Sequence, residues 1–126
     1  MNFPENVKYT KDHEWIKIEG NIGTIGITEH AAGELGDVVY IDIPDAAAEV
    51  SMHDTFGTIE AVKTVADLFS PVSGRITEVN TALNDAPETV NQDPYGEGWI
   101  VKMELTHMDE LSELMDAAAY REMVGQ

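Results

Sequence analysis

The sequence contains no cysteine. This absence excludes disulfides, thiolate nucleophiles, iron–sulfur clusters and cysteine-based zinc sites, and it favours a reducing compartment. No apolar run approaches the roughly 20 residues of a membrane-spanning helix. Residues 1–5 have neither the basic flank nor the apolar centre of a secretion signal. We therefore expect a cytoplasmic protein that has no membrane partner.

Basic side chains are also scarce, because 7 Lys and Arg stand against 24 Asp and Glu, for a formal net charge of −17. Nucleic acids bind clustered basic side chains, so the composition predicts no nucleic-acid partner. The 126 residues and the hydrophobic fraction of 43% are ordinary for one folded domain. We expect residues 1–126 to form a single domain, a self-repelling monomer that meets basic patches on other proteins.

Most of the chain has the pattern of short strands separated by turns. Strands are predicted over residues 15–18, 22–27, 39–43, 55–62, 65–69, 75–79 and 99–105. In the third of these, Val39, Ile41 and Ile43 are expected to share one face. In the last, Trp99 is expected to face the same way as Val101, and Ile100 the opposite way.

Helices are predicted at two places. Thr28 is a good N-cap and Gly36 a natural C-terminal stop, which together predict a helix over 29–35. Apolar residues at helical spacing between Met108 and Ala118 predict either one helix or two short ones, with Asp116 capping the second. Many short strands with little helix indicate an all-β sandwich or barrel.

The usual catalytic patterns are missing. The four histidines, at positions 13, 30, 53 and 107, have no metal-binding spacing. Ser51, His53 and Asp54 are too close in one turn to converge as a catalytic triad. The glycines do not precede a helix in the way a phosphate-binding loop requires. The sequence therefore predicts no enzyme active site.

Lys63 is the one unusual basic residue. It lies between Ala61-Val62 and Thr64-Val65, at the predicted hairpin tip over 62–64, and residues 18–62 carry nine carboxylates but no Lys or Arg. Two interpretations fit this spacing. Lys63 is either a surface lysine that serves solubility or an exposed amine that a modifying enzyme reaches.

The residues around Lys63 resemble a known family. Residues 59–64 (Ile-Glu-Ala-Val-Lys-Thr) and 70–74 (Ser-Pro-Val-Ser-Gly) are similar to the lipoyl-attachment hairpin of the glycine cleavage system H proteins. The similarity extends in order and spacing to residues 13–15, 24–28, 35–39 and 91–99 and to the acidic C-terminal helix. It covers about residues 7–122.

The resemblance implies a barrel-sandwich hybrid of two antiparallel sheets, with Lys63 on a β-hairpin turn and a helix at the C-terminus. It implies a lipoyl carrier and not an enzyme, in which Lys63 holds lipoate through an amide. In the family, the arm accepts an aminomethyl group from a pyridoxal-phosphate glycine decarboxylase and passes its methylene to tetrahydrofolate on an aminomethyltransferase. Dihydrolipoamide dehydrogenase then reoxidises the arm.

The resemblance also assigns site residues. Glu14 and Asp67 match family positions that line the cleft for the loaded arm, and Asp12 stands where the family often has serine. Glu60 matches a residue expected to present the turn to the lipoyl-attaching enzyme. Ala61 and Thr64 replace a common serine and alanine. Carboxylates in such a cleft are expected to hold the ammonium of the aminomethyl group.

Alternative functions remain open at this point. A protein that delivers lipoyl or octanoyl groups in lipoate metabolism would use Lys63 in the same way, and a regulatory homologue has no distinguishing sequence feature. A biotin carrier is disfavoured because that family brackets its lysine with methionines, whereas Val62 and Thr64 flank this one.

Overall fold

The structure is a computed structural model that describes all residues from 1 to 126. Its strands are β1 (Lys8–Tyr9), β2 (Glu14–Glu19), β3 (Ile22–Ile27), β4 (Val38–Asp42), β5 (Glu49–Val50), β6 (Thr55–Ala61), β7 (Val65–Phe69), β8 (Gly74–Val79) and β9 (Val101–Leu105). The helices are α1 (Glu29–Leu35), α2 (Thr89–Gln92) and α3 (Ala117–Met123), with two 3₁₀ segments, η1 (Thr81–Asn84) and η2 (Met108–Glu113).

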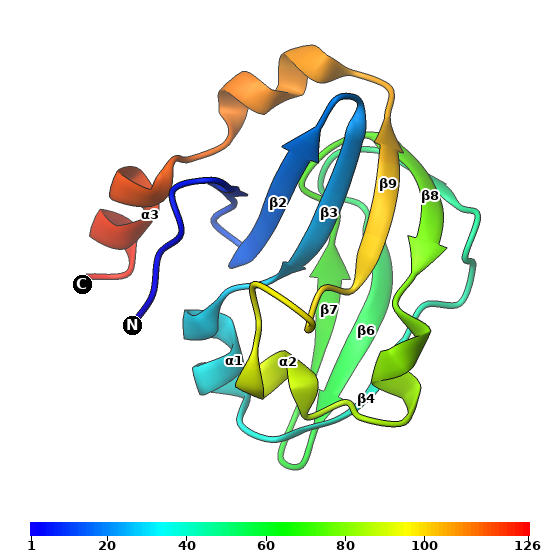
Figure 1. The fold of residues 1–126 in the computed structure, drawn as a ribbon, viewed down its shortest axis with the longest axis vertical. Helices are drawn as coiled ribbons and strands as arrows, with labels where there is room; N and C mark the ends of the chain where they lie inside the picture. The colour runs from blue at the N-terminus through cyan, green and yellow to red at the C-terminus, as the bar shows by residue number, and fades with distance from the viewer.

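The strands form two sheets, and every strand pair is antiparallel. One sheet has the order β1-β2-β3-β9-β8-β5, and the other has the order β4-β6-β7 (Figure 1). The apolar faces of both sheets supply one core, in which Ile16, Ile25 and Met103 of the larger sheet join Ile59 and Leu68 of the smaller. The predicted fold of two antiparallel sheets with short helices is confirmed.

Trp15 links the sheet to the loop before β9. It is buried on β2 and pairs with Gly26 on β3, where an added Cβ would lie within 2.8 Å of the indole ring. Its indole N–H donates to the carbonyls of Ile27 and Pro94, each at 3.0 Å. Only glycine leaves room for this ring at position 26, so Gly26 allows the two strands to pack closely here.

Two details of the predicted strands are wrong. The register between β4 and β6 shifts between Val38 and Tyr40, and this bulge leaves Val39 exposed and off the face expected for it. The last strand begins at Val101, so Trp99 precedes it. Ile100 is buried, although it lies just before the strand. Its N–H donates to the carbonyl of Ile25 on β3, and its carbonyl accepts from the N–H of Asn80, which follows β8.

The C-terminal segment forms two short helices, η2 and α3, which confirms the second of the two predicted arrangements and excludes a single helix. Asp116 caps α3 by accepting a hydrogen bond from the N–H of Ala119 at 2.9 Å. Between η2 and α3, Met115 forms two backbone hydrogen bonds with Tyr9 and extends the edge of β1. Figure 1 shows this segment passing over one end of the larger sheet before α3 comes to lie beside the N-terminus. None of the helices has the length and hydropathy needed to cross a bilayer.

Candidate functional site

The hairpin of β6 and β7 carries Lys63 at its tip, at the lower end of the molecule in Figure 1. The N–H of Ala61 donates to the carbonyl of Thr64 at 2.8 Å and closes the turn. Val62, Lys63 and Thr64 are all exposed, and neither of the two ion pairs in the structure involves Lys63. The tip therefore presents a free primary amine, and the predicted turn over 62–64 is confirmed.

The segment that follows α1 supports this tip. Gly36 ends the helix with φ +78° and ψ −158°, a conformation open to glycine alone. A Cβ added there would lie 3.4 Å from Cε of Lys63, so the lysine stem runs along the end of α1. The next residue, Asp37, accepts a hydrogen bond through its carbonyl from the N–H of Val62 at 3.0 Å. The hairpin tip is thus attached to the end of α1.

A cavity of about 180 Å³ lies against the same helix. Its walls come from the β1–β2 connection, β2, the end of β3, α1, β6 and β7, and it is lined by Asp12, His13, Glu14, Ile27, Ala31, Glu34, Leu35, Ile59, Ala66, Asp67 and Leu68. The structure thus brings Asp12, Glu14 and Asp67 to one place. It does not bring Glu60 there, because Glu60 is exposed and pairs with Tyr40 and Val65 on the outer row of the small sheet.

Glu14 is the most deeply buried of these carboxyl groups, at 2% exposure. Its Oε2 accepts from the N–H of Phe69 at 3.1 Å, and its Oε1 accepts from the hydroxyl of Thr10 at 3.3 Å. Burial raises the pKa of Glu14 to about 8, against the opposing effect of the Phe69 hydrogen bond, and Asp12 raises this pKa further. Glu14 is therefore mostly protonated at neutral pH.

Asp12 and Asp67 are placed nearer to solvent. Asp12 is half-buried in the turn that Thr10 stabilises, where the Thr10 hydroxyl accepts from the N–H of Asp12 at 3.2 Å. Asp67 is exposed and pairs with Thr58 on the edge strand β7. Because consecutive residues of a strand face opposite sides, Asp67 faces away from Leu68 and contributes at the rim of the cavity.

Sequence reasoning missed three neighbours of these carboxyl groups. His13 and Glu34 line the cavity, and His30 lies against His13 with 4.8 Å between ring centroids. Nε2 of His30 is 3.1 Å from Oε1 of Glu34. Burial lowers the pKa of His13, and the nearby His30 lowers it further. The i,i+4 spacing of His30 and Glu34 on the predicted helix was a usable signal, since such pairs share a helix face.

Tyr120 connects the C-terminal helix to the cavity wall. Its hydroxyl lies 2.8 Å from Nδ1 of His13 and 2.7 Å from Oγ1 of Thr28, the N-cap of α1. Its ring is buried and stacks on Tyr9 at 4.6 Å. Burial raises the pKa of Tyr120 to about 12, so the phenol stays protonated. One hydroxyl thus joins α3, the cavity histidine and the first turn of α1.

We expect Tyr120→Phe to destabilise the protein by about 1–3 kcal/mol, because it keeps the buried ring but leaves His13 and Thr28 without this partner. Urea unfolding measures the change. Tyr40→Phe is the matched control, since Tyr40 is 53% exposed, and it should change the free energy of unfolding by less than about 0.5 kcal/mol. Equal values for the two variants would contradict a structural role for the Tyr120 hydroxyl.

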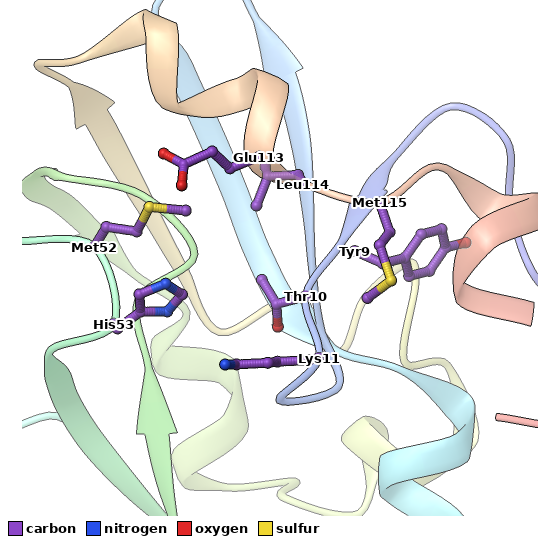
Figure 2. Close-up of a pocket in the computed structure, with 8 residues that line it drawn as sticks. All are labelled: Tyr9, Thr10, Lys11, Met52, His53, Glu113, Leu114 and Met115. Atoms are coloured by element: carbon purple, nitrogen blue, oxygen red, sulfur yellow. The ribbon is translucent and has the colours of Figure 1, made fainter. Parts of the chain in front are cut away.

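A larger cavity, of about 280 Å³, lies between the β1–β2 connection, the turn before β6 and the end of η2. Figure 2 shows Lys11 extending toward His53 across this space, with Glu113 and Leu114 on the opposite wall. It shares no lining residue with the smaller cavity. Volume alone does not select the site, because the predicted carboxyl groups gather in the smaller cavity beside the hairpin.

The smaller cavity combines apolar walls from Ile27, Ile59 and Leu68 with carboxyl groups at its depth and rim. Such a site fits a slender apolar chain that ends in an ammonium group. The adjacent hairpin offers a primary amine to which a chain could be joined.

Comparison with known proteins agrees with this geometry. A family model described as "Glycine cleavage H-protein" matches residues 7–126. This chain belongs to the glycine cleavage H-protein family. The glycine cleavage system H protein of Symbiobacterium thermophilum is 55% identical over 119 residues, which cover 94% of this chain and 93% of the relative. The H protein of Chlorobium limicola is also 55% identical, over the whole of both chains.

A solved H protein shares the fold. The crystal structure of the glycine cleavage system H protein from Mycobacterium marinum is 40% identical and superposes with a TM-score of 0.89, covering 98% of this chain and 99% of the other. The lipoyl-domain-like barrel-sandwich fold implied by the resemblance is thereby confirmed for this H-protein chain.

Proposed function

We propose that this protein is the lipoyl carrier of a glycine cleavage system and that Lys63 holds lipoate through an amide. The observation that carries the proposal is the placement of Lys63, an exposed amine on a closed turn whose stem runs along Gly36 at the end of α1. The same helix supplies Ala31, Glu34 and Leu35 to the wall of the acidic cavity. The hairpin and the cavity therefore share one support.

The residues present fit a lipoyl arm. The turn has no ion pair to Lys63 that would compete with acylation, and the cavity offers apolar walls for a hydrocarbon chain. When bound, lipoate supplies the disulfide that accepts the aminomethyl group of glycine and the dithiol that must later be reoxidised.

Glu14 is proposed to protect the loaded arm. With its pKa raised to about 8 it holds a proton at neutral pH, and an ammonium docked beside it would lower this pKa and release that proton. The resulting carboxylate would hold the ammonium in its charged form, with Asp12 and Asp67 adding negative charge nearer the rim. A nitrogen kept protonated has no free electron pair with which to expel the thiolate, so the aminomethyl group is retained.

The partners proposed for this carrier are the glycine decarboxylase, the aminomethyltransferase, dihydrolipoamide dehydrogenase and a lipoyl-attaching enzyme. The net charge of −17 favours basic docking surfaces on these larger enzymes. Glu60, three residues before Lys63 and exposed on the outer row of the sheet, is proposed to help the attaching enzyme recognise the turn. Residues 1–126 are proposed to act as one monomeric, non-catalytic unit.

Reconstitution tests the proposal. Lipoylated protein, mixed with the three glycine cleavage enzymes, tetrahydrofolate and NAD, should support NADH formation that depends on glycine. Unlipoylated protein is the control and should support none. If the protein is lipoylated on Lys63 but supports no glycine-dependent NADH formation, the carrier role is wrong. Transfer of the lipoyl or octanoyl group from Lys63 to a second protein would then favour the delivery role.

A further inference from the structure

Asn91 lies on α2, 28 positions after Lys63 in the sequence, and its side chain reaches the segment beneath the hairpin tip. Its Oδ1 accepts from the N–H of Val38 at 2.9 Å, and its Nδ2 donates to the carbonyl of Gly36 at 2.8 Å. One amide therefore bridges the two residues on either side of Asp37. It satisfies the backbone N–H of Val38 and the backbone carbonyl of Gly36, as the backbone of a neighbouring strand would.

The orientation of this amide follows from its partners. Val38 offers a donor and Gly36 an acceptor, so turning the amide over would place two donors together and two acceptors together. The backbone that carries Asn91 is also fixed, because the preceding residue, Val90, is fully buried in the main core. Asn91 is thus a fixed point on which the 36–38 segment rests.

The 36–38 segment in turn touches the hairpin tip twice. The carbonyl of Asp37 accepts from the N–H of Val62, the residue before Lys63, at 3.0 Å. Gly36 lies under the Lys63 stem, where an added Cβ would be 3.4 Å from Cε and 3.8 Å from Nζ. Asn91 is therefore connected to Lys63 through residues 36–38, a short loop that contains the positive-φ Gly36.

We propose that Asn91 is a positioning residue for the acylation of Lys63. By fixing Gly36 and Val38, it holds the Asp37 carbonyl where it anchors Val62, and so it presents the Lys63 amine in one geometry to the attaching enzyme. This inference rests on the proposed lipoylation of Lys63. It adds that the reactivity of the turn depends on a side chain from a distant helix that touches neither the lysine nor the arm.

Asn91→Asp tests the proposal, because it keeps the side-chain volume and the acceptor for Val38 but replaces the donor to Gly36 with a second acceptor. Asn80→Asp is the matched control. Asn80 likewise uses its side-chain amide to bind backbone, since it donates to the carbonyls of Glu97 and Trp99, but it lies in a different loop. Asn91→Ala serves as a second variant, and near-ultraviolet circular dichroism verifies that each protein is folded.

Two measurements decide the outcome. Hydrogen exchange of the Val62 amide should speed up about tenfold in Asn91→Asp and remain unchanged in Asn80→Asp. This difference is expected even if both variants lose thermal stability to the same extent. With a lipoate-attaching enzyme, kcat/KM for lipoylation should fall about tenfold in Asn91→Asp and less than twofold in Asn80→Asp. Wild-type exchange at Val62, or equal lipoylation of the two variants, would overturn the proposal. Failure of the native protein to accept lipoate at all would instead overturn the proposed function, and the exchange measurement would still test the link to Val62.

Discussion

Lys63→Arg is expected to abolish lipoylation and with it all glycine-dependent NADH formation in the reconstituted system. Arginine keeps the positive charge and an extended stem, but its guanidinium does not form the amide under these conditions because it stays protonated. The turn itself should survive, because its hydrogen bonds come from the backbone of Ala61, Val62 and Thr64. We expect the free energy of unfolding to change by less than about 0.5 kcal/mol.

Intact-mass analysis after expression in cells that make lipoate measures the first effect. The native chain should carry one lipoyl group and the Lys63→Arg variant none. Lys17→Arg is the control, since Lys17 is an exposed lysine on β2, and this variant should remain fully lipoylated. A lipoyl group found on the Lys63→Arg variant would show that another lysine is the attachment site and would remove the hairpin from the proposal.

Glu14→Gln is expected to change the pH dependence of stability. The pKa of Glu14 is raised from its ordinary value of 4.5 to about 8, so the folded state keeps a proton that the unfolded state loses above pH 4.5. Stability from this group is fully present below pH 4.5 and is lost as pH rises through about 8. The amide of glutamine resembles the protonated acid and does not titrate. At about 1.4 kcal/mol per pH unit, we expect the variant to gain about 4 kcal/mol relative to the native protein between pH 5 and pH 8.5.

Urea unfolding of both proteins at pH 5, 7 and 8.5 measures this gain. The lowered pKa of His13 makes the stability rise with pH, which is opposite to the effect of Glu14. The quantity to compare is therefore the difference in free energy of unfolding between the variant and the native protein at each pH. Glu60→Gln, at an exposed glutamate of the β6–β7 hairpin, should leave the pH dependence of the free energy of unfolding unchanged. If the free energies of unfolding of Glu14→Gln and the native protein change in parallel with pH, Glu14 does not titrate in this range and its raised pKa is wrong.

The same variant separates stability from function. An amide at position 14 has no proton to release and gains no charge when an ammonium docks. We therefore expect the aminomethyl group to be lost faster from the loaded Glu14→Gln protein than from the native one, although the variant loses less stability as the pH rises. An unchanged decay half-life would remove Glu14 from the proposed protection of the arm.

Local signals in the sequence predicted the parts of the fold that depend on local chemistry. Thr28 and Gly36 bound α1 at the expected residues because a cap hydrogen bond and a left-handed C-terminal glycine act within one turn. Asp116 identified α3 for the same reason. The hairpin tip was predictable because two runs rich in β-branched residues flank a short break.

Other elements have no local signal. The two-residue strands β1 and β5 are too short to show a period, and α2 has four residues and no side-chain cap, so none of them was predicted. The bulge that exposes Val39 and the burial of Ile100 arise from pairing with distant residues. Alternation within one strand carries no information about such partners.

A strongly acidic, cysteine-free β protein with one isolated lysine on a turn could be predicted from the amino-acid sequence, because composition, caps and strand periods act over a few neighbouring residues. The folded chain was needed to show that Asp12, Glu14 and Asp67 share a cavity with His13 and Glu34, and that Asn91 supports the loop beneath Lys63. The elevated pKa of Glu14 belongs to this second group. It follows from burial among segments that are distant in the sequence, and desolvation is a property of the assembled fold that no short stretch of sequence contains.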